Sequence, residues 1–275
     1  MMNRVFVGVS VVGLAASGAL AATFFESGAA GTFAAPSPWA QDRYAPGEWT
    51  PGATDPLGGD ALRLGIRNAD RRNLRNASFN SGFYDTQGRQ TSASVSGNWE
   101  VGGELFIPGS WLTPGTLRRS DLWARDNNPV ENDARYVIVG FINNDPNDGF
   151  NPDAANFVPR FRSWDSTVGW TDLNVPVLAD QYNSFQIINT GTSHDYYING
   201  MLVASNGGAS YSDAGFTDLQ TVFLEAFNFG NADNAATLTD SGYDAYWRNV
   251  YAVVPTPASV GLLGLGGLLA ARRRR

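Results

Sequence analysis

The sequence contains no cysteine, no lysine and only one histidine. The absence of cysteine excludes disulfide bonds, thiolate metal sites and a cysteine nucleophile. A single histidine excludes a metal site built from several imidazoles and weakens the case for a serine-histidine triad. We expect His194, which lies between Ser193 and Asp195 at the start of a predicted strand, to be exposed and solvated.

The first 21 residues have the pattern of a secretory signal peptide. Arg4 precedes an uncharged, mostly apolar stretch, residues 5–21. Ala19 and Ala21 are the small side chains that fit the groove of a signal peptidase beside the cleaved bond. The alternative, a buried N-terminal helix, would have to accommodate three glycines within that stretch. We therefore interpret residues 1–21 as a signal peptide, and we expect signal peptidase to cleave after Ala21 or Ala22 during export.

The C-terminal tail, residues 254–275, combines three elements. They are a Pro-x-Pro motif of Pro255, Thr256 and Pro257, an uncharged apolar segment over residues 259–271, and a terminal run of Arg272, Arg273, Arg274 and Arg275. Each proline disfavours helix in the residue before it, so the motif stays extended. The apolar segment can enter a bilayer as a single anchor helix, although its 13 residues fall short of the roughly 20 that a full span needs. The arginines stop transfer on the cytoplasmic side.

This order of elements resembles the PEP-CTERM sorting signal. That family typically has Pro-Glu-Pro, so Thr256 makes the motif a variant. The resemblance implies recognition by an exosortase, a membrane-embedded cysteine protease, with cleavage near the motif and transfer to a surface acceptor. The alternative is an ordinary C-terminal membrane anchor that is never processed.

Between the two ends lies an acidic segment, residues 22–253, whose length is compatible with one large all-β domain. Five of the 19 basic residues belong to the ends, so 14 remain against 26 acidic residues, a net charge of −12. Such a charge disfavours binding to nucleic acid or to anionic lipid, because both rely on clustered basic residues.

Short apolar and aromatic segments of this domain alternate with clusters of Gly, Asn, Asp and Pro, which is typical of a sandwich or barrel. In residues 61–67, for example, apolar and polar side chains alternate with a period of two, which predicts one buried and one wet face. The sequence therefore predicts an all-β fold, an antiparallel β-sandwich. The predicted strands cover residues 61–67, 98–107, 136–142, 157–164, 183–189, 194–198, 201–205, 221–229 and 243–253.

The clearest local signal is Asn199-Gly200 between two β-rich segments, because this pair supplies the two positive φ angles of a type I′ hairpin turn. A further strand precedes the hairpin, so that three strands form a meander. The meander, with its Tyr-x-Asn-Gly-x-Leu-Val segment over residues 197–203, resembles the concanavalin A-like (laminin G-like) jelly roll.

Glycoside hydrolases on that fold resemble one another in a strand with Glu-x-Asp-x-(x)-Glu, and no such motif occurs here. Glu100 and Glu104 share one strand face but are separated by two glycines, which favours a solvated face. Glu225 lies in a strongly apolar predicted strand, where burial would raise its pKa. No partner for Glu225 is visible in the sequence, so we assign no catalytic residue and predict a protein that is not an enzyme.

Two tryptophans, Trp164 and Trp170, flank a short loop that is suited to exposure, and we predict that they stack on sugar rings. Trp99, Trp123 and Trp247 lie within strand-like segments and are expected in the core, where aromatic side chains contribute most of the buried area.

A loop rich in Asp and Asn concentrates hard oxygen ligands of the kind that calcium prefers. Its candidate ligands are Asp145, Asn147, Asp148 and Asp153. The spacing departs from an EF-hand and no glutamate closes the loop. The alternative is a structural turn, because Asn and Asp side chains stabilise turns by local hydrogen bonds. No other cofactor is predicted.

These patterns predict an exported protein of the cell surface or extracellular matrix, held transiently in the inner membrane by its C-terminal segment. We expect signal peptidase and an exosortase as processing partners and an extracellular polysaccharide as ligand. The alternatives are an enzyme that acts on polysaccharide through an atypical site at Glu225, and a purely structural matrix component.

Overall fold

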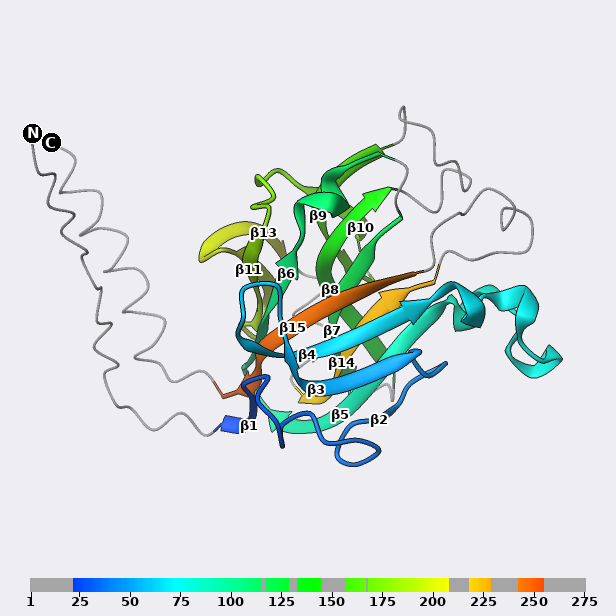
Figure 1. Ribbon diagram of the computed structural model, residues 1–275. Coiled ribbons are helices and arrows are strands. Elements are labelled where there is room, and N and C mark those ends of the chain that lie inside the picture. The colour runs from blue at the N-terminus through cyan, green and yellow to red at the C-terminus, as the bar shows by residue number, and fades with distance from the viewer. Residues whose placement is uncertain are drawn as a thin grey trace, which may run out of the picture. The chain divides into compact units, whose positions relative to one another are not determined.

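Two antiparallel β-sheets make up the described part of the chain (Figure 1). The computed structural model describes residues 22–114, 117–128, 133–144, 157–166, 168–207, 218–228 and 242–254. The predicted signal peptide, the sorting motif with its arginine run and all four candidate calcium ligands lie outside these ranges, so those predictions stay predictions. No helix within the described ranges is long and apolar enough to cross a membrane.

The first sheet has eight strands within the described residues, in the order β13-β12-β11-β6-β15-β4-β3, with β1 paired to β15. Its strands are β1 (Ala22–Glu26), β3 (Glu48–Thr54), β4 (Asp60–Arg67), β6 (Trp99–Ile107), β11 (Gln181–Asn189), β12 (Ser193–Ile198), β13 (Met201–Gly207) and β15 (Gly242–Val253).

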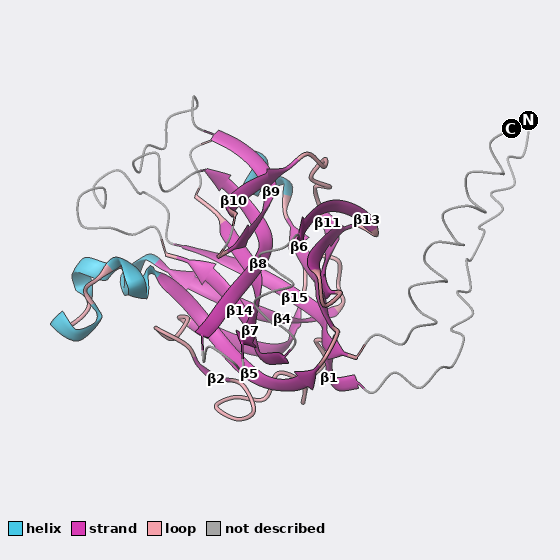
Figure 2. Ribbon diagram, turned by 180° about the vertical axis from the view of Figure 1, so that it is seen from behind, coloured by secondary structure: helices cyan, strands magenta, loops and turns pink. Residues whose placement is uncertain are grey.

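The second sheet has seven strands in the same described ranges, in the order β10-β9-β8-β7-β14-β5-β2. They are β2 (Ala40–Gln41), β5 (Thr86–Ser96), β7 (Arg119–Asn128), β8 (Asp133–Asn144), β9 (Phe157–Asp165), β10 (Gly169–Leu173) and β14 (Asp218–Phe227). The helical segments of the described chain are short 3₁₀ turns, most of them in one run between β4 and β5 (Figure 2): η1 (Asn68–Asp70), η2 (Arg72–Leu74), η3 (Ala77–Phe79), η4 (Gly82–Asp85) and η5 (Gly109–Leu112).

The inner faces of the two sheets pack against each other around one apolar core. Trp99 and Trp247 of the eight-stranded sheet are fully buried, as their predicted place in the core requires. Phe185 of β11 meets Phe161 of β9 with 5.4 Å between ring centroids, which joins the sheets. The Trp247 indole also donates to the Ser120 hydroxyl of β7 at 2.9 Å. Each fully buried phenylalanine contributes about 1.5–3 kcal/mol. The predicted all-β sandwich is confirmed.

All nine predicted strands are present, with boundaries that shift by up to three residues. The predicted hairpin joins β12 to β13 through Asn199 and Gly200, whose φ angles are 51° and 76°. The Asn199 side chain also accepts a hydrogen bond from the backbone N–H of Ser184 at 2.9 Å, which ties the turn to β11. Six strands were not predicted, among them β5 and β7, because their sequences are rich in polar side chains.

One prediction about the core was wrong. His194 was expected to be exposed, but it is 2% exposed and its ring lies 5.4 Å from the ring of Trp99. The strand alternates, so that His194, Tyr196 and Ile198 all point inward. The Asn189 amide nitrogen lies 3.3 Å from His194 Nε2 and provides a polar contact in this buried position.

Candidate functional site

The outer face of the seven-stranded sheet carries two adjacent rows of side chains from five strands. Directly paired residues of antiparallel strands point to the same face, and alternate residues on these strands belong to the inter-sheet core. We call the first the polar row: Glu225, Asp121, Gly140, Arg162 and Asp172, in order from β14 to β10. The second is the aromatic row: Phe223, Trp123, Ile138, Trp164 and Trp170.

The aromatic row forms a second apolar cluster, separate from the core. Trp123 and Phe223 are buried in it, and Tyr136, Trp164 and Trp170 are half-buried around them. Trp123 is buried as predicted, but it packs on the outer face of the sheet and not between the sheets. The outer face of a sandwich is normally polar, so an apolar cluster at this position requires a function or a cover.

The two tryptophans predicted to bind sugar lie opposite each other on β9 and β10, with 6.4 Å between their ring centroids. They belong to the strands and not to the loop that joins them. The Arg162 guanidinium lies 3.7 Å from the Trp170 ring centroid, and the Arg119 guanidinium lies 4.8 Å from it. Cation-π contacts of buried guanidinium groups are stronger than exposed ones, so these arginines fix the orientation of the Trp170 ring.

Asp121 provides the negative charge that pairs with Arg119 in this part of the site. It is 1% exposed, and its Oδ2 accepts hydrogen bonds from Arg119 Nε at 2.6 Å and from Trp123 Nε1 at 3.4 Å. Its neighbour across the strands is Gly140, where a side chain would collide with the Asp121 carboxylate and the Ser120 carbonyl. Glycine at position 140 therefore provides the space that the carboxylate occupies.

Glu225 lies beside Asp121 in the polar row and is 0% exposed. Burial raises the pKa of Glu225 well above its ordinary value, and the nearby Asp42 carboxyl raises this pKa further, against an opposing effect of Arg43. A Cβ atom at Gly88, its partner on β5, would lie 2.6 Å from the Glu225 carboxyl carbon, so glycine is again required. The burial expected for Glu225 is confirmed.

The segment between β2 and β3 lies over the Glu225 end of the row. The Arg43 guanidinium is held between two rings, 4.6 Å from the centroid of Trp123 and 4.7 Å from that of Phe83. Asp42 brings its carboxyl beside Glu225. The face thus has an acidic end closed to solvent and an aromatic end, at Trp164 and Trp170, that is partly open.

The sequence could not reveal Asp42, Arg119, Asp121 or Arg162 as partners of these side chains, because the strand register alone brings them together. Among the residues that the structure describes, no three His, Asp or Glu side chains are grouped to hold a metal ion. In the polar row, Asp121 pairs with Arg119 and Asp172 pairs with Arg160.

Comparison with known proteins gives no family. The sequence matches no protein-family model and no curated protein. Among solved structures it is similar to a Crh5 transglycosylase in complex with NAG, with 14% identity, 86% of each chain covered and a TM-score of 0.48. It is also similar to a Bacillus licheniformis beta-glucanase, with 11% identity, 85% of this chain and 98% of that chain covered and a TM-score of 0.45. A third is the carbohydrate-binding module CBM66 from Bacillus subtilis, with 11% identity, 78% and 95% covered and a TM-score of 0.39. Similarity at this level assigns no function.

Proposed function

We propose that the protein is exported, is processed by an exosortase at its C-terminal tail, and binds extracellular polysaccharide without cleaving it. The observation that carries the binding proposal is the aromatic row on the outer face of the seven-stranded sheet. A sugar ring has apolar C–H faces that stack on aromatic side chains and hydroxyl groups that pair with charged ones. Trp164 and Trp170 offer the first surface, and the exposed carboxylate of Asp172, at the same end of the polar row, offers the second.

Binding is favoured over cleavage because Glu225 and Asp121, the two adjacent carboxyl groups of the polar row, are closed to solvent. Glu225 is 0% exposed and Asp121 is 1% exposed, so neither touches a ligand on this face in the present conformation. Cleavage is the second candidate, since an acid with a raised pKa next to a carboxylate is the pair that glycoside hydrolysis uses. It requires the segment that carries Asp42 and Arg43 to move.

The replacement of both Trp164 and Trp170 by alanine is expected to reduce polysaccharide affinity by roughly 100-fold or more, because each buried aromatic anchor typically contributes about 2 kcal/mol. The full-length chain in mild detergent is applied to a glycan array, in calcium and again in chelator. Loss of binding in chelator would support calcium at the loop that contains Asp145.

The control for this double variant is Leu57→Ala, which removes an exposed apolar side chain (59% exposed) away from the aromatic row. Circular dichroism verifies that both variants fold. Failure of the wild-type chain to bind any glycan, or full binding by the double variant, would contradict the proposal.

The sorting part of the proposal predicts a shorter chain in cells that contain an exosortase. Mass spectrometry of the mature protein should show a C-terminus near Pro255 to Pro257, with the terminal arginine run removed. Replacement of both prolines by alanine is expected to leave the tail intact, because the motif is then free to become helical. The control host lacks an exosortase. An intact tail on the wild-type protein in both hosts would identify an unprocessed anchor.

A further inference from the structure

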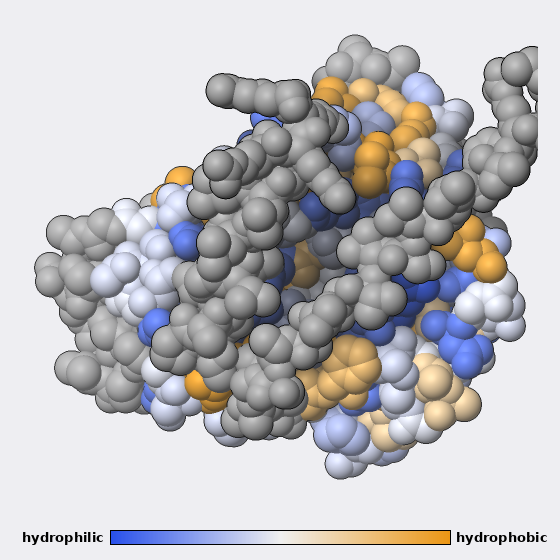
Figure 3. Space-filling model, turned by 90° about the vertical axis from the view of Figure 1, so that its left-hand side faces the viewer, coloured by the Kyte–Doolittle hydropathy of each residue, from blue (hydrophilic) through white to orange (hydrophobic). Residues whose placement is uncertain are grey.

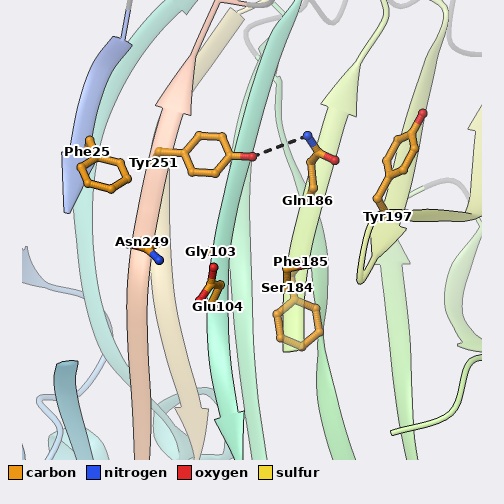
Figure 4. Close-up of a pocket in the computed structure, with 10 residues that line it drawn as sticks. Phe25, Gly103, Glu104, Ser184, Phe185, Gln186, Tyr197, Asn249 and Tyr251 are labelled. Carbon is orange, nitrogen blue, oxygen red and sulfur yellow. Dashed lines mark hydrogen bonds between the residues drawn. The ribbon is translucent and has the colours of Figure 1, made fainter. Parts of the chain in front are cut away.

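A hollow of about 240 Å³ opens on the outer face of the eight-stranded sheet (Figure 4). It crosses five strands, β1, β15, β6, β11 and β12. Strand pairing aligns one row of side chains along it: Phe25, Tyr251, Gly102, Gln186 and Tyr197. Figure 4 shows Phe25 and Tyr197 at the two ends of this row, with Tyr251 and Gln186 joined by a hydrogen bond between them.

The Tyr251 ring is fixed across the middle of the sheet. A Cβ atom at Gly102 would lie 2.6 Å from atoms of this ring, so only glycine lets the tyrosine lie over β6. The Tyr251 hydroxyl donates to Glu100 Oε1 at 2.7 Å, and Gln186 Nε2 donates to the same oxygen at 2.6 Å. Burial and the Glu100 carboxylate raise the pKa of Tyr251, so its hydroxyl keeps its proton.

Polar side chains line the rest of the hollow. Arg248 Nε donates to Glu104 Oε2 at 2.7 Å, which holds the carboxylate in place. The Arg248 guanidinium also lies 3.6 Å from the Tyr182 ring centroid, so it is engaged on both sides. Ser184 and Asn249 complete the lining, and their side chains have no hydrogen-bond partner among the described residues. They are therefore available to a ligand.

The chemistry of this lining selects the class of ligand. Glu100 and Glu104 lie at the hollow or beside it, and Arg248 is already paired, so an anionic ligand would be repelled. Aromatic rings at both ends and amide, hydroxyl and carboxylate groups between them suit a ring with apolar faces and hydroxyl edges. The Phe25 side chain is 58% exposed and is therefore accessible to a ligand. Figure 3 shows hydrophobic patches among hydrophilic residues on one side of the molecule.

We propose that this hollow is a second saccharide site, which takes a neutral hexose unit of a polysaccharide. This inference rests on the proposed function, because it assigns the same class of ligand to the opposite side of the sandwich. The aromatic row and the hollow lie on the outer faces of two sheets that are packed face to face. One protein molecule therefore bridges two polysaccharide chains and cross-links the matrix.

The test uses the full-length chain in mild detergent. Calorimetric titration with neutral hexaoses of glucose and of mannose should give two sites per wild-type molecule, and beads that carry the bound hexaose should aggregate. Tyr197→Ala removes one aromatic end, and Ser184→Phe fills the hollow. Each variant is expected to retain one site and to need at least tenfold more protein to aggregate the beads. Leu202→Ala, at the position paired with Tyr197 on β13, is the matched control.

The outcomes separate this inference from the proposed function. If calorimetry gives one site per wild-type molecule, and the Trp164 and Trp170 substitutions abolish that site, the hollow is not a saccharide site. The proposal for the aromatic row would then remain intact. Undiminished aggregation by Tyr197→Ala and Ser184→Phe would also show that the hollow is not a saccharide site. Binding that survives the tryptophan substitutions but disappears with Ser184→Phe would establish the hollow and overturn the aromatic row as a site.

Discussion

Asp121→Ala is expected to lower the free energy of unfolding by about 3–5 kcal/mol, the cost of removing one partner from a buried ion pair. Arg119, which is 6% exposed, would lose its carboxylate at 2.6 Å while remaining inside the protein. The indole N–H of Trp123 would lose an acceptor as well. Urea unfolding at neutral pH measures this change. An equal dependence of the free energy of unfolding on urea concentration in wild type and variant verifies that the denatured state is unaltered.

The matched control is Asp172→Ala at the other end of the polar row. The Asp172 side chain is 63% exposed and pairs with Arg160 at 2.7 Å. An exposed pair of this kind contributes about 0–1 kcal/mol, so the control should stay near wild-type stability. Equal losses for the two variants would show that the buried network around Asp121 does not have the energetic role that its geometry indicates.

Loss of the Asp121 carboxylate should also affect the end of the face that carries Trp164 and Trp170. Arg119 and Arg162 both lie against the Trp170 ring, and Asp121 holds Arg119 at that position. Folded Asp121→Ala protein should therefore bind glycan more weakly than wild type, although Asp121 itself is closed to the ligand. Asp121 of the polar row therefore helps to fix the position of the Trp170 ring in the aromatic row, because it holds Arg119 against that ring.

Sequence patterns predicted the strands whose inner side chains are strongly apolar, and they predicted the β12-β13 hairpin from its turn residues. They failed where few strongly apolar side chains mark the buried face of a strand. β5, for example, is buried at alternate positions along TSASVS, yet only Ala and Val mark those positions. Pairing with neighbours on both sides holds such a strand in the sheet, and that pairing is not encoded locally.

The site was predictable only in fragments. Trp164, Trp170 and Glu225 were singled out by their types and their neighbours, but their grouping depends on the register of β14, β7, β8, β9 and β10. A slip of one residue would move every side chain of a strand to the other face. For the same reason the inward position of His194 was missed, since Ser193 and Asp195 beside it point outward.

Glu225→Gln is expected to stabilise the protein at neutral pH and to have little effect near pH 4. The pKa of Glu225 is raised by burial first and by Asp42 second. Between the unfolded pKa of about 4.3 and the higher folded pKa, the folded state holds a proton that the unfolded state releases. Stability therefore falls as pH rises through that window, by about 1.4 kcal/mol for each pH unit. Glutamine stays neutral at both pH values, so the variant has no proton to release on unfolding.

Urea unfolding of both proteins at pH 4 and at pH 7.5 measures this effect. Glu104→Gln serves as the control, because Glu104 is a partly exposed partner of Arg248 and its loss should not stabilise the chain at either pH. Parallel pH dependence of wild type and Glu225→Gln would mean that Glu225 does not carry the raised pKa.

The same substitution separates binding from cleavage. If the protein only binds polysaccharide, Glu225→Gln leaves glycan binding unchanged, because Glu225 does not reach the surface, and neither protein releases soluble sugar. If Glu225 is a general acid, the wild type releases new reducing ends and Glu225→Gln releases at least 100-fold fewer, because glutamine cannot give up a proton to the leaving group. A folded, more stable and inactive variant would then show that the buried acid is kept at the expense of stability for the sake of catalysis.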